Sequence, residues 1–528
     1  MNFKSITLLL LFSVFASAIN PQLTLDWKYR ARASITGIET ADLDGDGILE
    51  ILASSNDGYV YALNSSGNLL WRVYSRCQMF SVKAEDITGD GKPEVLAGGC
   101  RHLQIIDNSG SEMFKYHVGL EIHDIDVSDL DGDGIMEIVM IAHSFSGSQS
   151  SVSVVAPNGQ TLWRKDFSGA RIRGLALADV NGDGNTDILV AGRSLVAYDR
   201  FGRVLWSVNL GASCERIVVS DDGRILVGAS NRLFIIDFNG NILKIVDAAG
   251  MVFDVADFEG NYFLASASLA KISKTSLEKS WSAYDGQDFT VVVAGDIDGF
   301  GSAEVVAGGK SINVFGLDGG MLWDYSPYLS VSGLKVVDVD GDGFKEVIAG
   351  ARDFNVYYVK HTTSYIKSVE AERTYMDAVN LKDEGRIDDA LEFALKSVSI
   401  NPSVEKYVFL RDTLLEMMEY DAAETEFRIV FSQAQSFAGQ NRFEQALEYA
   451  ERALNISTSM GYEAGVRESF ELIGYIEAEQ DRLSVLQTTT TLLKSSFTAG
   501  GANLKLIAPV AGLLTLFFIF ILVYSGRI

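Results

Sequence analysis

The nine residues D-L-D-G-D-G-I-L-E, from Asp42 to Glu50, recur almost unchanged along the chain. The other copies begin at Asp86, Asp129, Asp179 and Asp338. Each copy places oxygen-bearing side chains at positions 1, 3, 5 and 9 around glycines that permit a tight turn. A hard cation such as Ca²⁺ takes about six to eight oxygen ligands, which a short folded loop can bring together. The sequence therefore predicts about five calcium sites, one in each of these Asp loops.

The Asp loops differ from the calcium loop of an EF-hand. An EF-hand needs a bidentate Glu at position 12 and a helix on each side. Position 12 is apolar in the four closest copies, where it is Ala53, Met140, Val190 or Ala349. Short apolar runs flank the loops, such as E-I-L-A-S from Glu50 and L-K-V-V before Asp338. Each Asp loop is therefore predicted to join two strands.

The Asp loops belong to a longer repeat, because most neighbouring copies lie 42 to 44 residues apart. A second feature keeps the same period: a polar hairpin ends in glycine, and an aromatic residue follows four positions later, as in Gly67 and Trp71. All six tryptophans occupy this position or its equivalent: Trp27, Trp71, Trp163, Trp206, Trp281 and Trp323. Four short strands in ~40–45 residues are typical of a propeller blade. We expect the tryptophans to fill the wedge between blades and not to stack on a ligand.

Two weaker units, Cys214–Lys244 and Gly250–Trp281, keep the strand pattern but have only remnants of the Asp loop. Counting both gives eight blades, with seven as the alternative. Leu23–Arg30 reads as an outer strand that would complete the last blade and close the ring, which removes exposed sheet edges. The predicted fold is an all-β propeller over residues 19–360, followed by an all-α helical-hairpin domain and one transmembrane helix.

The Asp loops resemble FG-GAP repeats, the calcium-bearing blades of integrin α-subunit propellers. Hairpin segments such as Y-A-L-N-S-S-G-N-L-L-W, which ends at Trp71, resemble the blades of pyrroloquinoline-quinone-like propellers. Together the two resemblances cover residues ~20–360. In the copy beginning at Asp296, Phe300 replaces the third donor, so no site is predicted there.

The FG-GAP resemblance implies a ligand set from positions 1, 3, 5 and 9 and the backbone carbonyl of position 7. The implied metal ligands are Asp42, Asp44, Asp46, Ile48, Glu50, Asp86, Thr88, Asp90, Lys92, Glu94, Asp129, Asp131, Asp133, Ile135, Glu137, Asp179, Asn181, Asp183, Asn185, Asp187, Asp338, Asp340, Asp342, Phe344 and Glu346.

Beyond residue 360 glycine becomes rare and apolar residues adopt helical spacing over residues 361–486. The segments 385–402 and 441–454 resemble halves of tetratricopeptide repeats, and 420–430 resembles a degenerate copy. Such helices could hold a partner or form a stalk, and the sequence leaves both readings open. Residues 487–505, rich in Thr, Ser, Gly and Ala, are expected to form a flexible tether.

Both ends of the chain indicate export and membrane anchoring. Residues 1–18 combine a short apolar run with a small-residue cleavage site, as in a secretory signal peptide. Residues 506–524 are apolar and uncharged over a length that can span a bilayer, and residues 525–528 form a short tail. We therefore expect a single-pass membrane protein whose bulk is extracellular or in the envelope space. Of the three cysteines, Cys77 and Cys100 are expected to pair, and Cys214 is expected to be buried.

Composition argues against two function classes. The net charge of −26 disfavours a nucleic-acid surface, since phosphate binding needs clustered Lys and Arg. The five histidines follow no catalytic or metal-binding pattern, and no nucleotide loop, nucleophile elbow or HExxH motif occurs. His123 is expected to be a satisfied structural residue. We expect no catalytic residues and no organic cofactor.

Three hypotheses for the function follow, in order of preference. The first is a non-enzymatic, membrane-anchored calcium-binding propeller that mediates adhesion by binding an extracellular protein or glycan. The second is a scaffold for envelope assembly, like the Trp-docked lipoprotein propellers. The third is a quinone-dependent or sugar-processing propeller enzyme.

Overall fold

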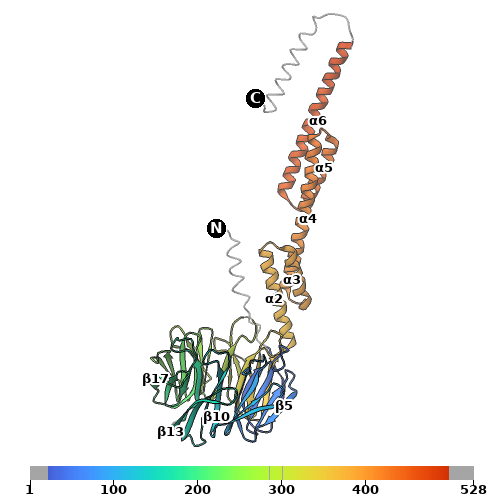
Figure 1. Ribbon diagram of the computed structural model, residues 1–528. Helices are drawn as coiled ribbons and strands as arrows, with labels where there is room; N and C mark the ends of the chain where they lie inside the picture. The colour runs from blue at the N-terminus through green and yellow to red at the C-terminus, as the bar shows by residue number, and fades with distance from the viewer. Residues whose placement is uncertain (1–21, 170, 285, 300, 499–528) are drawn as a thin grey trace. The chain divides into compact units, whose positions relative to one another are not determined.

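A computed structural model describes residues 22–498, except residues 170, 285 and 300. The first part of the chain forms eight four-stranded antiparallel sheets, each of which is one blade of a β-propeller (Figure 1). The prediction of eight blades is confirmed, and the alternative of seven is wrong. The predicted signal peptide, the predicted transmembrane segment 506–524 and the predicted tail lie outside the described residues.

Successive strands run from the central channel to the rim in every blade. Blades 1 to 4 contain β2 (Ile35–Ala41), β3 (Glu50–Ser55), β4 (Tyr59–Leu63), β5 (Leu69–Tyr74); β6 (Met79–Glu85), β7 (Glu94–Gly99), β8 (His102–Ile106), β9 (Glu112–His117); β10 (Glu121–Ser128), β11 (Glu137–His143), β12 (Gln149–Val155), β13 (Thr161–Ser168); and β14 (Gly174–Ala178), β15 (Asp187–Ala191), β16 (Ser194–Tyr198), β17 (Val204–Asn209). Blades 5 to 7 contain β18 (Cys214–Val219), β19 (Arg224–Ala229), β20 (Arg232–Asp237), β21 (Ile242–Asp247); β22 (Asp254–Phe258), β23 (Asn261–Ala265), β24 (Leu269–Ser273), β25 (Lys279–Ala283); and β26 (Val291–Gly295), β27 (Glu304–Gly308), β28 (Ile312–Phe315), β29 (Met321–Tyr325).

Blade 8 closes the ring with strands from both ends of the propeller. It contains β30 (Val331–Val337), β31 (Glu346–Ala351), β32 (Asn355–His361) and, at its rim, β1 (Leu23–Arg30). The register runs antiparallel from Leu23 opposite His361 to Arg30 opposite Asn355. The predicted closing strand is confirmed with its predicted bounds.

The second strand of most blades is buried along its whole length, as in β3, β7 and β31. Each such strand lies between two others of its own sheet, and both of its faces pack against neighbouring blades. After the carboxylate that begins the strand, its central side chains are therefore Ile, Leu, Val and Ala without polar alternation. The hydrophobic core is thus a series of wedges between blades.

Antiparallel pairing divides the connections between two ends of the propeller. The Asp loops join first to second strands, and the glycine hairpins join third to fourth strands, so both lie at the same end of the propeller. We call this end the Asp-loop end. The turns between second and third strands and the links between blades lie at the opposite end, which we call the turn end. Backbone hydrogen bonds confirm this, since Asn56 N donates to Ser34 O and Val118 N to Arg101 O.

The tryptophans join neighbouring blades at the Asp-loop end. Trp71 Nε1 of blade 1 donates to the Asn108 carbonyl of the blade 2 hairpin at 3.2 Å. Its ring covers Gly110, whose φ is +88° and where a Cβ would come within 2.6 Å of the ring. The same contact recurs between Trp27 and Gly67, and between Trp163 and Gly202. The predicted wedge role is confirmed, and each contact joins the tryptophan of one blade to the hairpin glycine of the next blade.

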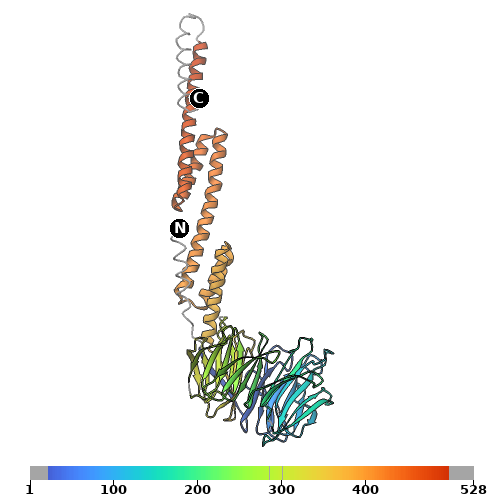
Figure 2. The same ribbon diagram turned by 90° about the vertical axis from the view of Figure 1, so that its left-hand side faces the viewer.

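Up to residue 498, where the described part of the chain ends, five helices follow the propeller: α2 (Thr363–Asp383), α3 (Ile387–Ile400), α4 (Glu405–Gly439), α5 (Phe443–Ser459) and α6 (Glu463–Thr498) (Figure 2). The chain divides into two compact units between Val369 and Glu370, so the first turns of α2 belong to the propeller unit. Within the helical unit, buried alanines lie where α5 meets its neighbours, including Ala446 and Ala450. Small side chains permit this close approach, as the repeat-like pattern predicts.

Two predictions about the helical region are wrong. Residues 420–430 form no separate repeat half, because they lie inside the unbroken 35-residue helix α4. Residues 487–498 of the predicted tether belong to α6. Their threonine hydroxyls donate to carbonyls four residues earlier, as Thr489 does to Val485 at 2.6 Å, so a Thr-rich stretch can remain helical. In the described part of the chain no helix is long and apolar enough to cross a membrane.

Candidate metal centres in the Asp loops

The position-1 aspartate organises each Asp loop around its own carboxylate. Asp42 accepts hydrogen bonds from Gly45 N at 2.7 Å and from Gly47 N at 2.9 Å. These glycines have φ of +84° and +87°, a region that glycine adopts without steric cost. The same pair of bonds recurs in the loops that begin at Asp86, Asp129, Asp179, Asp296 and Asp338.

The position-9 carboxylate lies buried beneath the loop. Glu50 is 4% exposed, and one of its oxygens accepts a hydrogen bond from Leu43 N at 2.8 Å. The equivalent residues are equally buried and accept the equivalent bond: Glu94, Glu137, Asp187, Glu304 and Glu346. The local sequence explains the burial, since position 9 begins the fully buried second strand.

Burial and neighbouring carboxylates raise the pKa of these position-9 residues. Burial, followed by the nearby Asp340 and Asp342, raises the pKa of Glu346 to about 8. Burial and Asp298 raise the pKa of Glu304 to about 7, and burial raises that of Asp187 to about 6. The pKa values of Glu50, Glu94 and Glu137 are raised for the same reasons. Grouped carboxylates of this kind must either take up protons or share a cation.

Positions 1, 3 and 9 converge where all three are acidic. Ligand oxygens lie within 4.8 Å of one another in the groups Asp42–Asp44–Glu50, Asp129–Asp131–Glu137 and Asp338–Asp340–Glu346. Thr88 and Asn181 take position 3 in the other two predicted loops, and both still face position 9. Thr88 Oγ1 donates to Glu94 at 3.2 Å, and Asn181 Nδ2 donates to Asp187 at 3.4 Å.

Positions 5 and 7 form the outer side of the loop. Asp46 accepts a hydrogen bond from Ile48 N at 2.8 Å, which folds position 7 back over position 5. The same bond links Asp90 to Lys92, Asp133 to Ile135, Asp183 to Asn185 and Asp342 to Phe344. Phe344 differs from its equivalents because it is buried against Tyr365 and Val369 of α2. These all-oxygen donor sets fit Ca²⁺.

The loop that begins at Asp296 keeps the arrangement of positions 1, 3 and 9, although Phe300 replaces its third donor. Asp296, Asp298 and Glu304 place oxygens within 4.8 Å of one another. Phe300 removes the side-chain donor at position 5, whereas the hydrogen bonds at positions 1 and 9 match those of the other loops. A pattern that requires a donor at position 5 therefore misses this loop.

Blades 5 and 6, whose loops are remnants, use a cation from the chain itself. The Lys274 side chain is 9% exposed, and its ammonium group forms ion pairs with Asp221 and with Asp257, the latter at 2.6 Å. Although burial lowers it, the hydrogen bonds that Lys274 donates to these carboxylates and their negative charge raise the pKa of Lys274 above its usual value. Sequence reasoning missed this contact, because the lysine lies far from Asp221 along the chain.

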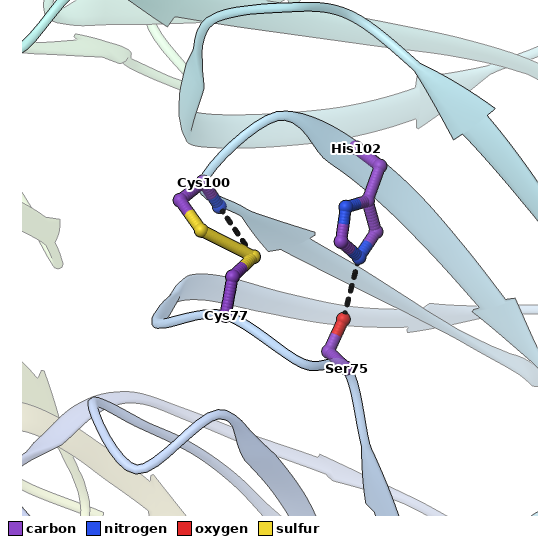
Figure 3. Close-up of a disulfide and its surroundings, with 4 residues drawn as sticks. All are labelled: Ser75, Cys77, Cys100 and His102. Atoms are coloured by element: carbon purple, nitrogen blue, oxygen red, sulfur yellow. Dashed lines mark hydrogen bonds between the residues drawn. A yellow bond between two sulfur atoms is a disulfide. The ribbon is translucent and has the colours of Figure 1, made fainter.

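A disulfide joins Cys77 and Cys100 at the turn end, with Cα atoms 5.8 Å apart, as expected (Figure 3). Beside it, Ser75 Oγ and His102 Nε2 form a 2.7 Å hydrogen bond that sequence reasoning missed. Ser75 is 1% exposed, so its hydroxyl has no path to a substrate. Cys214 is buried as predicted, and burial raises the pKa of its thiol to about 12.

His123 is not the satisfied residue that the sequence predicts. Its Nε2 is buried without a hydrogen-bond partner in the described part of the chain, 3.6 Å from Glu121. Its ring stacks on that of His143 with centroids 3.5 Å apart. His123 is the extra residue of a β-bulge between β10 and β11. Arg171 Nε donates to His143 Nε2 at 3.3 Å.

Comparisons with known proteins agree with this architecture. A family model described as the λ-carrageenase β-propeller domain matches residues 24–102, and one described as an FG-GAP-like repeat matches residues 129–190. A search among curated proteins gave no match. The structure of BamB from Moraxella catarrhalis is similar with a TM-score of 0.50 and 14% identity, over 65% of this chain and 98% of that one.

Two further solved structures are similar at lower scores. The BBS1N structure in complex with ARL6DN has a TM-score of 0.44 and 12% identity, over 65% of this chain and 98% of that one. The Pan2 WD40 domain of Neurospora crassa has a TM-score of 0.40 and 10% identity, over 65% and 97%. The eight four-stranded sheets and the family match at residues 129–190 show that the protein is an eight-bladed β-propeller protein with FG-GAP-like repeats.

Proposed function

We propose that this protein is a calcium-stabilised, membrane-anchored recognition propeller that binds protein or glycan partners without catalysing a reaction. One observation carries the proposal: six loops bury a position-9 carboxylate beneath further oxygen donors, in the same way each time. The membrane anchor would be residues 506–524, with the bulk of the chain exported.

The contribution of bound calcium to the free energy of unfolding would be large enough for a structural role. Extracellular calcium modules bind with Kd of about 10⁻⁴–10⁻³ M. At about tenfold excess of the ion, each site adds roughly 1.4 kcal/mol to the free energy of unfolding. Six independent sites would add about 8 kcal/mol, which is comparable with the ~5–15 kcal/mol that stabilises a whole domain. The repetition of the loops needs no catalytic explanation.

The surroundings of the histidines support a non-enzymatic role. His102 bonds a serine that is buried, and His361 is buried with its Nε2 2.8 Å from the Ile297 carbonyl. Burial lowers the pKa of His123 to about 3 and that of His143 to about 4, so neither would serve as a general base near neutral pH.

A urea titration of the full chain in detergent tests the calcium part of the proposal. The unfolding midpoint in calcium should lie well above that in chelator, and added calcium should restore it. Magnesium at the same concentration should restore less, because Mg²⁺ demands octahedral geometry and keeps its waters. Identical midpoints in calcium and in chelator would refute the proposal.

The second candidate is a scaffold for envelope assembly, and the helical unit favours it. Exposed apolar side chains such as Phe409, Phe470 and Tyr475 lie along the helices, where a partner could pack. Co-purification of the full chain with membrane-insertion machinery would separate this function from adhesion. If variants at these three positions co-purify with that machinery as well as the wild type does, the helices do not carry the scaffold function.

A further inference from the structure

Eight equivalent side chains line a cavity at the turn end of the central channel. Each blade contributes one residue, at or just before the start of its first strand: Thr36, Phe80, His123, Arg173, Glu215, Phe253, Thr290 and Ser332. We call this set the mouth ring. The cavity has a volume of about 490 Å³, within the range of ligand pockets. The mouth ring therefore shows one structural position with several different side chains.

The hydroxyl members of the mouth ring bond to the backbone of the next blade. Thr36 Oγ1 donates to the Met79 carbonyl at 2.9 Å, and Thr290 and Ser332 make the equivalent bond. His123 occupies the same position, but its Nε2 is buried and has no hydrogen-bond partner among the described residues. A buried polar atom without a partner destabilises the fold, so the position of His123 suggests a ligand.

Two further side chains that can bind a metal ion lie beside His123. Glu121 begins β10 and lies opposite His143, the last residue of β11. One ligand atom from each of the three residues lies within 4.8 Å of the other two. Because Arg171 Nε donates to His143 Nε2, the proton of this imidazole is on Nδ1, which lies 3.1 Å from the Ser144 carbonyl. A bond from the other ring nitrogen to a carbonyl typically orients a histidine that binds a metal ion.

The charges around the two histidines permit a cation. Burial lowers the pKa of both rings, and the uncharged imidazole is the form that binds metal ions. Arg173 forms an ion pair with Glu215, which compensates its charge. Arg171 is half-buried, and an ion would displace it from His143 Nε2. The two imidazole planes lie 15° apart, so the His123 ring would also turn out of its stack to share an ion with His143.

We propose that Glu121, His123 and His143 bind a zinc ion, with water completing its coordination. Two imidazoles and one carboxylate are a donor set that Zn²⁺ uses when it has three protein ligands. The Asp loops offer oxygen donors, which suit Ca²⁺, so the two ions would occupy different sites. The zinc site is independent of the calcium proposal, because it shares no residue with the Asp loops.

Isothermal titration calorimetry of the full chain in detergent tests the inference, with bound metals first removed and calcium then restored to saturation. One zinc ion per chain should bind. His143→Gln should weaken binding by more than the about 10–100-fold that loss of an outer-shell partner costs. His117→Gln is the matched control, since His117 is exposed at the end of β9, and it should leave the affinity for zinc unchanged.

Arg171→Gln should change the affinity in the opposite direction. It removes the donor that occupies His143 Nε2 together with one positive charge, so zinc should bind about tenfold more tightly. Co²⁺ in place of zinc should give the intense visible absorption of a four-coordinate site, and His143→Gln should abolish that absorption.

The absence of zinc binding in saturating calcium would overturn the inference. Equal effects of His143→Gln and His117→Gln would also overturn it, because they would mark adventitious binding at surface histidines. So would an affinity that Arg171→Gln leaves unchanged or weakens. The urea midpoint in calcium and in chelator is measured on the same preparation. A chain that calcium stabilises but that binds no zinc contradicts this inference and leaves the calcium proposal intact.

Discussion

Replacing Gly110 with alanine should destabilise the propeller by about 2–5 kcal/mol. Gly110 has φ of +88°, and a side chain in this left-handed region costs about 1–2 kcal/mol. The new Cβ would also come within 2.6 Å of the Trp71 ring, and overpacking of this kind costs about 1–3 kcal/mol. The free energy of unfolding is measured by urea titration of the full chain in saturating calcium.

Gly119→Ala is the matched control, because it separates the backbone cost from the contact with tryptophan. Gly119 has φ of +84°, and no atom lies within 4 Å of the position that its Cβ would take. Gly119→Ala should therefore lower the free energy of unfolding by only about 1–2 kcal/mol. A Trp71→Leu background should reduce the cost of Gly110→Ala alone, which a double-mutant cycle would reveal. Equal costs for the two alanine variants would refute the role of Trp71 in joining blades 1 and 2.

Three further predictions follow from the buried charges and the disulfide. Lys274→Met should lower the free energy of unfolding by about 3 kcal/mol whether or not calcium is present, because it leaves the largely buried Asp257 without its cation. The control Lys310→Met, at an exposed ion pair, should lower it little. A loss for Lys274→Met that disappears in chelator would contradict this prediction. In chelator, the free energy of unfolding should fall as the pH rises from 5 to 8, because folded Glu346 has its pKa raised to about 8 and so binds its proton more tightly than the unfolded chain does. The increase in the free energy of unfolding that calcium produces should become larger over the same pH range. An increase that is constant with pH would argue against cation binding at these carboxylates. Replacing both Cys77 and Cys100 with serine should cost about 3 kcal/mol, because their 23-residue separation closes a substantial loop in the unfolded chain; an unchanged urea midpoint under oxidising conditions would contradict that estimate.

Local periodic features made most of the fold predictable. The Asp loops and the glycine-tryptophan spacing are each specified within a few residues, and their period gives the blade. The count of eight required the two blades without a full Asp loop to be recognised by their strand pattern alone. The outer strand Leu23–Arg30 could be placed because a ring with a free edge would expose backbone hydrogen-bonding groups.

Features that depend on distant residues could not be predicted. Lys274 meets Asp221 only because two blades lie side by side, and neither residue's neighbours in the sequence indicate the contact. The loop at Asp296 could not be assigned a site from its sequence, because Phe300 takes position 5, although backbone N–H groups and Glu304 maintain its shape. The continuity of α4 through residues 420–430 also escaped prediction, since its helical pattern resembles that of a hairpin.

The account's central claim is that the Asp loops hold calcium ions, and equilibrium dialysis of the full chain against radioactive calcium tests it most directly. The expected stoichiometry is one ion for each of the six loops that bury a position-9 carboxylate, and Glu137→Gln should lower it by one. Saturation without bound calcium, or an unchanged stoichiometry in the variant, would contradict the claim.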